Sequence, residues 1–139
     1  AGVVELIRKR HQAGVVMGGS SAGAAVMSEA MIAGDALPLD QGLALWPEAI
    51  VDQHFVARKR FNRSLRTIFS HPRKLGVGIG ESTAVVVDPV RRRAQVIGDG
   101  AVTVIDAREA TDSGTGEGDE KSWKGVRLQW LRRGAEFEY

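Results

Sequence analysis

The first part of the chain alternates between short apolar runs and stretches with helical spacing. The amphipathic segment before Gly14 ends in Lys, Arg and His, which is typical of the last turn of a helix. The apolar run at 13–19 predicts a buried strand, and the small residues at 22–33 predict the helix that follows it. A second strand is predicted at 49–55. A second helix is predicted at 58–70, because apolar side chains recur there at every third or fourth position.

From Leu75 onwards the apolar residues follow the period of a strand instead. Turn signals at Asp88-Pro89 and Gly98-Asp99-Gly100 separate short β-rich runs. The predicted strands are 75–80, 82–89, 93–98, 101–107 and 126–131. Residues 110–122 are rich in Gly, Asp and Glu and predict a flexible loop. Strand–helix units followed by antiparallel strands predict an α/β domain with a mixed sheet.

Composition narrows the class of protein. The 139 residues, 43% of them hydrophobic, suffice for one compact domain with a core. No apolar run approaches the ~18 residues of a membrane span. The absence of cysteine excludes disulfides, Cys-ligated zinc and cysteine nucleophiles. A net charge of +2 does not favour a protein that mainly coats nucleic acid.

The segment Gly19-Ser20-Ser21-Ala22-Gly23 fits the pattern G-x-S-x-G between a predicted strand and a predicted helix. A serine at such a tight turn has its hydroxyl pushed out of the sheet, where it can act as a nucleophile. The amide of Ala22 is then a candidate oxyanion donor. The alternative interpretation is a glycine-rich loop that merely allows close packing. A phosphate-binding loop would need G-x-x-x-x-G-K-[ST] or G-x-G-x-x-G, and neither is present.

A nucleophilic serine needs a base, and the chain has three histidines. His11 lies among charged residues at a helix end, where a solvated role is expected. His71 precedes Pro72 at a helix end, which indicates capping. His54 lies where a predicted strand meets a loop, the position at which active-site residues of open α/β sheets gather.

The sequence does not yet identify the acidic residue that would orient the histidine. Asp35 and Asp40 are candidates, but two others are better placed. Asp52 lies two residues before His54 on the same strand, and this spacing puts both side chains on one face. Glu81 directly follows a predicted buried strand. Spacing alone does not choose between Asp52 and Glu81.

A basic stretch follows His54. A solvated helix face is its ordinary interpretation. Carboxylate recognition is the functional alternative, because a guanidinium group can bind a carboxylate through two hydrogen bonds. Nucleic-acid binding is disfavoured by the lack of interleaved aromatic residues. The residues concerned are Arg58, Lys59, Arg60, Arg63 and Arg66.

Four segments, taken in order, resemble the cyanophycinase family, a group of serine exopeptidases related to peptidase E. They are GGSSAGAAVMSEAMI, DQHFVARKRFNR, GVGIGESTAVVV and VIGDGAVTVIDA. The resemblance runs from about Gly14 to Ala107 and continues weakly to the C-terminal residue. The DQHF block with its arginines is its most specific part, because peptidase E-type dipeptidases share the serine turn but not that block.

The resemblance implies a Ser–His–Glu triad in which Ser21 is the nucleophile, His54 the base and Glu81 the acid. It implies a three-layer αβα sandwich with a mostly parallel mixed sheet, like that of class I glutamine amidotransferases. No metal site is indicated, because three scattered histidines without H-x-x-x-H spacing are poor ligands, and no cofactor is expected. The implied substrate-binding residues are Gln53, Arg58, Arg60 and Arg63.

The activity implied by the resemblance is hydrolysis of cyanophycin, a polyaspartate with arginine on each β-carboxyl group, to β-Asp-Arg dipeptides. An aspartyl or isoaspartyl dipeptidase of the peptidase E type is the alternative. The expected partner is this polymer or an aspartyl peptide, without nucleic acid or membrane. A homodimer is the candidate assembly, and the cytoplasm is the expected location.

Two departures from the family pattern are visible. Gly80 stands where the family has an aspartate before the acid, which is expected to loosen hydrogen bonding or specificity there. The family's domain is also longer than this chain. Residues 1–139 are therefore expected to form the C-terminal part of a single cyanophycinase-like domain.

Overall fold

A computed structural model of the chain describes residues 2–34, 38–113 and 121–139. Its main feature is a four-stranded sheet in the order β10-β7-β4-β3. These strands are β3 (Ala49–Gln53), β4 (Leu75–Ile79), β7 (Ala101–Asp106) and β10 (Arg127–Arg132). β3 and β4 are parallel, whereas β7 is antiparallel to both of its neighbours.

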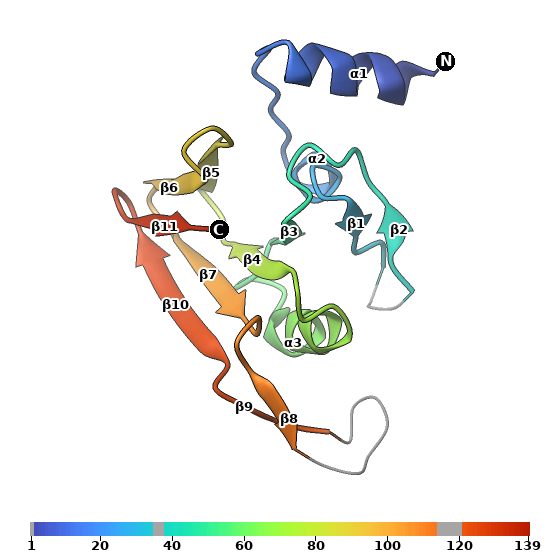
Figure 1. The fold of residues 1–139 in the computed structure, drawn as a ribbon. Helices are drawn as coiled ribbons and strands as arrows, with labels where there is room; N and C mark the ends of the chain where they lie inside the picture. The colour runs from blue at the N-terminus through green and yellow to red at the C-terminus, as the bar shows by residue number, and fades with distance from the viewer. Residues whose placement is uncertain (1, 35–37, 114–120) are drawn as a thin grey trace.

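Smaller antiparallel sheets flank this main sheet (Figure 1). One has the order β11-β6-β5. Two others are hairpin-like pairs, β1 with β2 and β8 with β9. The strands are β5 (Thr83–Asp88), β6 (Arg93–Gly98), β11 (Glu136–Glu138), β1 (Ala30–Met31), β2 (Asp40–Gln41), β8 (Thr111–Ser113) and β9 (Ser122–Lys124).

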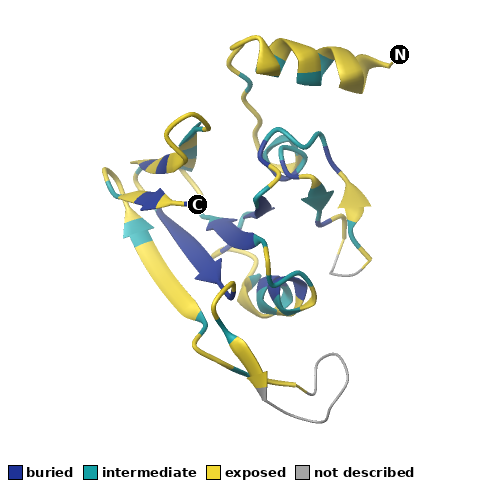
Figure 2. Cartoon of the chain, viewed as in Figure 1, coloured by how far each residue is buried: buried dark blue, intermediate teal, exposed yellow. Residues whose placement is uncertain are grey.

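Three helices belong to the described part of the chain. α3 (Phe61–Ser70) packs against β4 and β7, and its buried Ile68 contacts the face of the sheet. α2 (Ala22–Ala25) is a single turn that lies against β3. α1 (Val3–Gln12) has no buried residue and lies outside the core (Figure 2). Arg8 ties it to the segment after β2 by hydrogen bonds to the carbonyl oxygens of Leu43 and Gly42.

The core occupies both faces of the main sheet because its strands alternate between them. Ile50 of β3 packs with Ile68 of α3 on one face. Val51 packs with Trp46 and the β4 and β7 valines on the opposite face. β7 is buried throughout and β4 up to its last residue, while β10 is largely exposed (Figure 2). The central strands therefore form a rigid base for residues that follow their ends.

Most predicted elements are confirmed, but two in the first part of the chain are wrong. Residues 13–19 form no strand, and Val16 is 93% exposed. Among the described residues no strand pairs with this run, so its backbone has no ladder to join. The predicted helix at 22–33 ends after Ala25, and the chain then turns into β1.

The sheet also differs from the expectation of a mostly parallel one. Among the described strands, β3 with β4 is the parallel pair, and the other named pairs are antiparallel. In the main sheet the difference comes from β7, which lies between β4 and β10 and runs antiparallel to both. A short turn also joins β5 to β6 as an antiparallel pair. A mixed α/β fold is nevertheless confirmed. Of the predicted flexible loop at 110–122, residues 114–120 lie outside the described residues, and its flanks form β8 and β9.

No helix in the described ranges is long and apolar enough to cross a lipid bilayer.

Asp106 anchors the end of β7 to its edge strand, and this contact gives a testable pH dependence. It is 5% exposed and accepts hydrogen bonds from Arg108 Nε and Arg127 Nη2, both at 3.0 Å. The Arg108 hydrogen bond is the largest of the contacts that lower the Asp106 pKa from 3.8 to about 2. Because the folded-state pKa is lowered, the stabilisation is present above pH 3.8 and is lost as pH falls towards 2.

We expect Asp106→Asn to lower the free energy of unfolding at pH 7 by about 1–2 kcal/mol, since solvent weakens the pairs with the partly exposed arginines. Denaturant unfolding of the natural full-length protein at pH 7 and pH 3 measures this. The loss should shrink at the lower pH. Asp99→Asn, at an exposed ion pair with Arg133, is the matched control and should change little. Equal losses for the two variants would contradict the assignment.

Candidate active site

Ser21 lies at a sharp turn between residues 13–20 and α2. Its backbone has φ 53° and ψ −121°, a conformation that L-residues rarely adopt and that stores strain. The hydroxyl is exposed at the start of the helical turn. The amide of Ala22 makes no hydrogen bond within the described part of the chain. This is the geometry expected of a serine held out as a nucleophile beside a free backbone donor.

Small residues make this turn possible. A Cβ atom on Gly19 would lie 2.0 Å from the carbonyl oxygen of Gly23 and 2.6 Å from Cε of Met27. Only glycine fits there, because backbone atoms cannot move aside as a flexible side chain can. The first glycine of the sequence pattern thus lets the chain before Ser21 pack directly onto α2.

His54 and Glu81 follow the ends of neighbouring parallel strands. β3 and β4 are in register, with Gln53 opposite Ile79. Their carboxyl ends therefore meet at one edge of the sheet, so the residues just beyond both ends lie close together. His54 has φ 52°, which breaks the alternation of β3. This break turns the imidazole towards Ser21 instead of towards α3.

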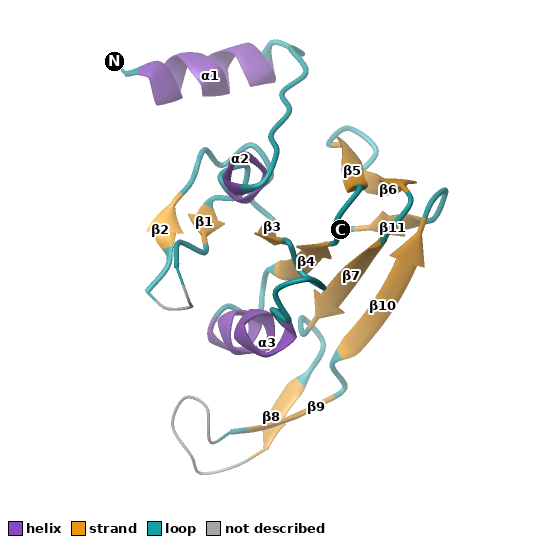
Figure 3. Ribbon diagram, turned by 180° about the vertical axis from the view of Figure 1, so that it is seen from behind, coloured by secondary structure: helices purple, strands orange, loops and turns teal. Residues whose placement is uncertain are grey.

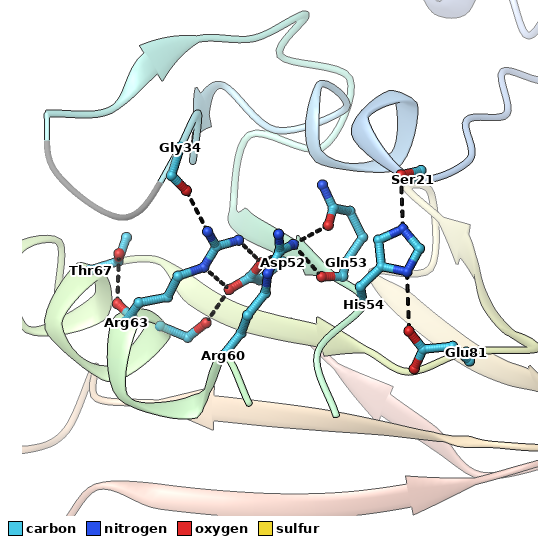
Figure 4. A network of polar contacts seen from close by, with 10 residues as sticks. Ser21, Gly34, Asp52, Gln53, His54, Arg60, Arg63, Thr67 and Glu81 are labelled. Atoms are coloured by element: carbon cyan, nitrogen blue, oxygen red, sulfur yellow. Dashed lines mark hydrogen bonds and ion pairs between the residues drawn. The ribbon is translucent and has the colours of Figure 1, made fainter. Parts of the chain in front are cut away.

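The three side chains form one continuous chain of hydrogen bonds (Figure 4). Ser21 Oγ lies 2.9 Å from His54 Nε2, and His54 Nδ1 lies 3.0 Å from Glu81 Oε1. A carboxylate only accepts, so the Nδ1–H donates to Glu81. Nε2 is then left to accept the hydroxyl proton of Ser21. This order of donors and acceptors is that of a general-base triad.

Glu81 remains ionised in this arrangement. The hydrogen bond from His54 is the largest of the contacts that lower the pKa of Glu81 below its usual value, and backbone amides, including that of Ala57, add to the effect. The backbone amide of Gly80 donates a hydrogen bond to the carbonyl oxygen of Ala101, with an N–O distance of 3.0 Å. A Cβ there would lie only 3.0 Å from that carbonyl oxygen, so the glycine allows a tight approach of β4 to β7.

Asp52, the rival candidate for the acid, points to the opposite face of β3. It is 2% exposed and accepts a hydrogen bond from Ser64 Oγ of α3 at 2.7 Å. Arg63 Nε donates to it at 2.9 Å, and Arg63 Nη2 also contacts it. Arg60 Nη1 lies 3.3 Å from Oδ1 of Asp52. The structure thus brings Glu81, and not Asp52, to His54.

The implied substrate-binding residues are divided between two places. Gln53 lines the cavity beside Ser21. The guanidinium groups of Arg60 and Arg63 point to Asp52, with side chains only 12% and 14% exposed. Arg58 is exposed on the turn after His54 and does not line that cavity. Among the described residues it has no side-chain hydrogen bond or ion pair.

The remaining candidates lie away from the Ser21–His54 pair. His71 Nδ1 lies 3.1 Å from the carbonyl of Thr67, which confirms the capping interpretation. His11, at the end of α1, lines the cavity beside Ser21 but has no hydrogen bond to Ser21 among the described residues. Asp40 lies on the exposed β2. Asp35 lies outside the described residues.

The cavity beside Ser21 has a volume of about 670 Å³ and is bounded mainly by apolar side chains. Val85 and Val87 of β5 form one wall, and Met27 and Trp46 contribute to another. The polar groups that reach it include Ser20, Ser21, Gln53, His54 and Glu81. The hydrogen-bonded side chains of Ser21, His54 and Glu81 therefore open onto a space large enough for part of a peptide.

Sequence reasoning missed the partners of the two arginines. Ser64 and the carbonyl of Gly34 complete the cluster around Asp52 and Arg63. The spacing held a signal, because Arg60, Arg63 and Ser64 fall on one face of a helix. That face meets β3 at Asp52, which only the tertiary arrangement shows.

The contact at Gly19 gives a prediction for this turn. We expect Gly19→Ala to lower kcat by about 10²-fold, because a displaced turn moves Ser21 away from His54. Steady-state kinetics of the full-length protein measure this. Gly14→Ala is unsuitable as a control, since Gly14 has φ +88°. Gly23→Ala is suitable because its Cβ would meet nothing within 4 Å. Equal activity of both variants and the parent would contradict the expected effect.

Comparison with known proteins shows the family of this chain. The family model described as peptidase family S51 matches residues 1–93. The chain is 38% identical to a cyanophycinase of Trichormus variabilis, over 97% of this chain and 49% of that protein. It is 37% identical to a cyanophycinase of Geminocystis herdmanii, over 97% of this chain and 54% of that protein. The chain thus spans about half the length of these curated relatives.

A solved structure described as a peptidase from an acI-B1 Actinobacterium has a similar fold. The TM-score is 0.59 at 20% sequence identity, covering 86% of this chain and 43% of that one. At this identity the likeness concerns the fold alone.

Proposed function

The chain belongs to peptidase family S51, and from this membership we propose that it carries the catalytic triad of a serine-type peptidase. The observation that supports the proposal most is the unbroken hydrogen-bond chain from Ser21 through His54 to Glu81. Ser21 is proposed as the nucleophile, His54 as the general base and Glu81 as the orienting acid.

In the proposed reaction, Ser21 Oγ attacks a peptide carbonyl carbon while His54 Nε2 takes the hydroxyl proton. The carbonyl oxygen becomes an oxyanion, to which the amide of Ala22 donates a hydrogen bond. His54 then gives its proton to the leaving amine, and the C–N bond breaks. Water, deprotonated by His54, hydrolyses the acyl-enzyme and restores Ser21. Glu81 stabilises the imidazolium without taking its proton.

We propose cyanophycin as the substrate, with β-Asp-Arg dipeptides as products, because the similar curated proteins are cyanophycinases. The charges beside the triad fit a substrate rich in carboxylates. Two guanidinium groups face the single carboxylate of Asp52, which leaves one positive charge in excess next to Gln53. Gln53 and Arg58 are the side chains proposed to contact the substrate.

We further propose that the complete fold is a three-layer αβα sandwich of the class I glutamine amidotransferase type. α3 on one face of the parallel β3–β4 pair supports it (Figure 3).

The substrate proposal is tested by hydrolysis assays of the full-length protein and its Ser21→Ala variant. The substrates are insoluble cyanophycin, isoaspartyl dipeptides and α-aspartyl dipeptides, and mass spectrometry identifies the soluble products. Release of β-Asp-Arg by the parent protein alone is the expected result. Cleavage of dipeptides without attack on the polymer would replace this substrate with that of an aspartyl or isoaspartyl dipeptidase.

A further inference from the structure

The guanidinium group of Arg60 holds the segment that carries His54. Its Nη1 donates to the backbone carbonyl of Gln53 at 2.5 Å and also contacts the Gln53 side-chain oxygen. The same nitrogen lies 3.3 Å from Asp52 Oδ1. One partly buried cation therefore joins the last two residues of β3 to the start of α3 (Figure 4).

The position of these contacts matters because His54 follows immediately. Its φ of 52° is unfavourable for a residue with a Cβ atom, and such a conformation persists only where the surroundings hold it. Backbone hydrogen bonds hold the part of the turn after His54. The Phe55 amide donates to the carbonyl oxygen of Ile79, and the Arg58 amide donates to that of His54. Arg60 holds the part before His54, because it donates to the carbonyl oxygen of the peptide that joins Gln53 to His54.

The same contacts orient the Gln53 side chain. Its carbonyl oxygen is engaged by Arg60, so the amide nitrogen points away from the guanidinium group (Figure 4). Gln53 also lines the cavity beside Ser21. The group that it offers there is consequently a hydrogen-bond donor, which suits a carbonyl or carboxylate oxygen.

The neighbouring arginine shows that Asp52 is the centre of this arrangement. Arg63 donates hydrogen bonds from Nε and Nη2 to the carboxylate of Asp52, and from Nη1 to the carbonyl oxygen of Gly34. Its guanidinium group thus braces the carboxylate that Arg60 also contacts. Burial is the largest cause that lowers the pKa of Arg60, and Arg63 lowers it further, while Asp52 acts in the opposite direction.

We propose that Arg60 is a positioning residue that holds the His54 turn and orients the Gln53 amide, and that it is not a substrate contact. The inference rests on the proposed function of the triad. It predicts that loss of Arg60 impairs Ser21 even towards a reagent too small to reach any substrate subsite. A substrate-binding role predicts no such loss.

A small fluorophosphonate ester tests this in the full-length protein. In the labelling step the Ser21 Oγ–P bond forms and the P–F bond breaks, fluoride leaves, and the hydroxyl proton passes to His54. We expect Arg60→Met to lower the labelling rate by about 10²-fold and to lower kcat more than it changes KM. Lys59→Met removes the adjacent, exposed charge and should label at the parent rate.

Arg60→Lys keeps a positive charge beside Asp52 and decides the question if Arg60→Met does not fold. It should label at an intermediate rate, because an ammonium group cannot reproduce the planar guanidinium geometry. A folded Arg60 variant that labels at the parent rate but hydrolyses substrate poorly would overturn the inference. A parent protein that does not label, with hydrolysis retained in Ser21→Ala, would instead overturn the proposed function.

Discussion

Replacing Ser21 with alanine in the full-length protein is expected to lower kcat by about 10⁶-fold, close to the loss of the whole triad. The substitution removes the attacking oxygen, and His54 and Glu81 then have no nucleophile to activate. The exposed position of Ser21 means that the free energy of unfolding should stay near that of the parent, or rise if the strained turn relaxes. Steady-state kinetics and denaturant unfolding measure the two quantities.

Ser20→Ala is the matched control for this substitution. Ser20 lies next to Ser21, is exposed and lines the same cavity, but its hydroxyl makes no contact with His54. We expect Ser20→Ala to keep kcat within a few-fold of the parent. A large loss of kcat in Ser20→Ala, with activity retained in Ser21→Ala, would show that Ser20 and not Ser21 is the nucleophile.

Replacing Glu81 with glutamine is expected to lower kcat by about 10⁴-fold. The amide has nearly the same shape as the carboxylate, but it no longer requires His54 to donate from Nδ1. The histidine can then present a protonated Nε2 to Ser21, which is the wrong tautomer for a base. The imidazolium that forms during the reaction also loses its negative partner.

Two further variants decide whether this effect belongs to Glu81. Glu136→Gln makes the same chemical change at an exposed carboxylate on β11 and should leave kcat unchanged. Asp52→Asn addresses the rival acid. If a folded Glu81→Gln protein keeps the parent kcat while Asp52→Asn loses it, the hydrogen bond between His54 and Glu81 is not used in catalysis.

The uncertainty between Asp52 and Glu81 shows what the sequence could not supply. Alternation along a strand would place Asp52 and His54 on one face, but alternation applies only as far as Gln53, the last residue of β3. The strand then ends and His54 adopts a positive φ, which turns its side chain to the face of Val51 and Gln53. No local pattern predicts that conformation, because it depends on the contacts that hold the turn.

The elements themselves were predictable where their signals were local. Residues 61–70 fold as part of the predicted helix, β4 to β7 lie within the predicted runs, and β10 overlaps its predicted run. β8 and β9 were not predicted, because their residues have the composition of a polar loop. The run at 13–19 has the composition of a buried strand but pairs with no described strand. β11 was missed because its three residues are too short for a periodic signal. The serine turn was predictable because its first glycine, Gly19, is required by packing within the motif itself.

The central claim is that His54 and Glu81 activate Ser21. It is tested most directly by locating the site at which a fluorophosphonate modifies the full-length protein. After digestion, tandem mass spectrometry should find one phosphonyl group on Ser21 in the parent protein and none in Ser21→Ala or His54→Ala. An adduct on another residue, or an unmodified Ser21 in a protein that hydrolyses its substrate, would contradict the claim.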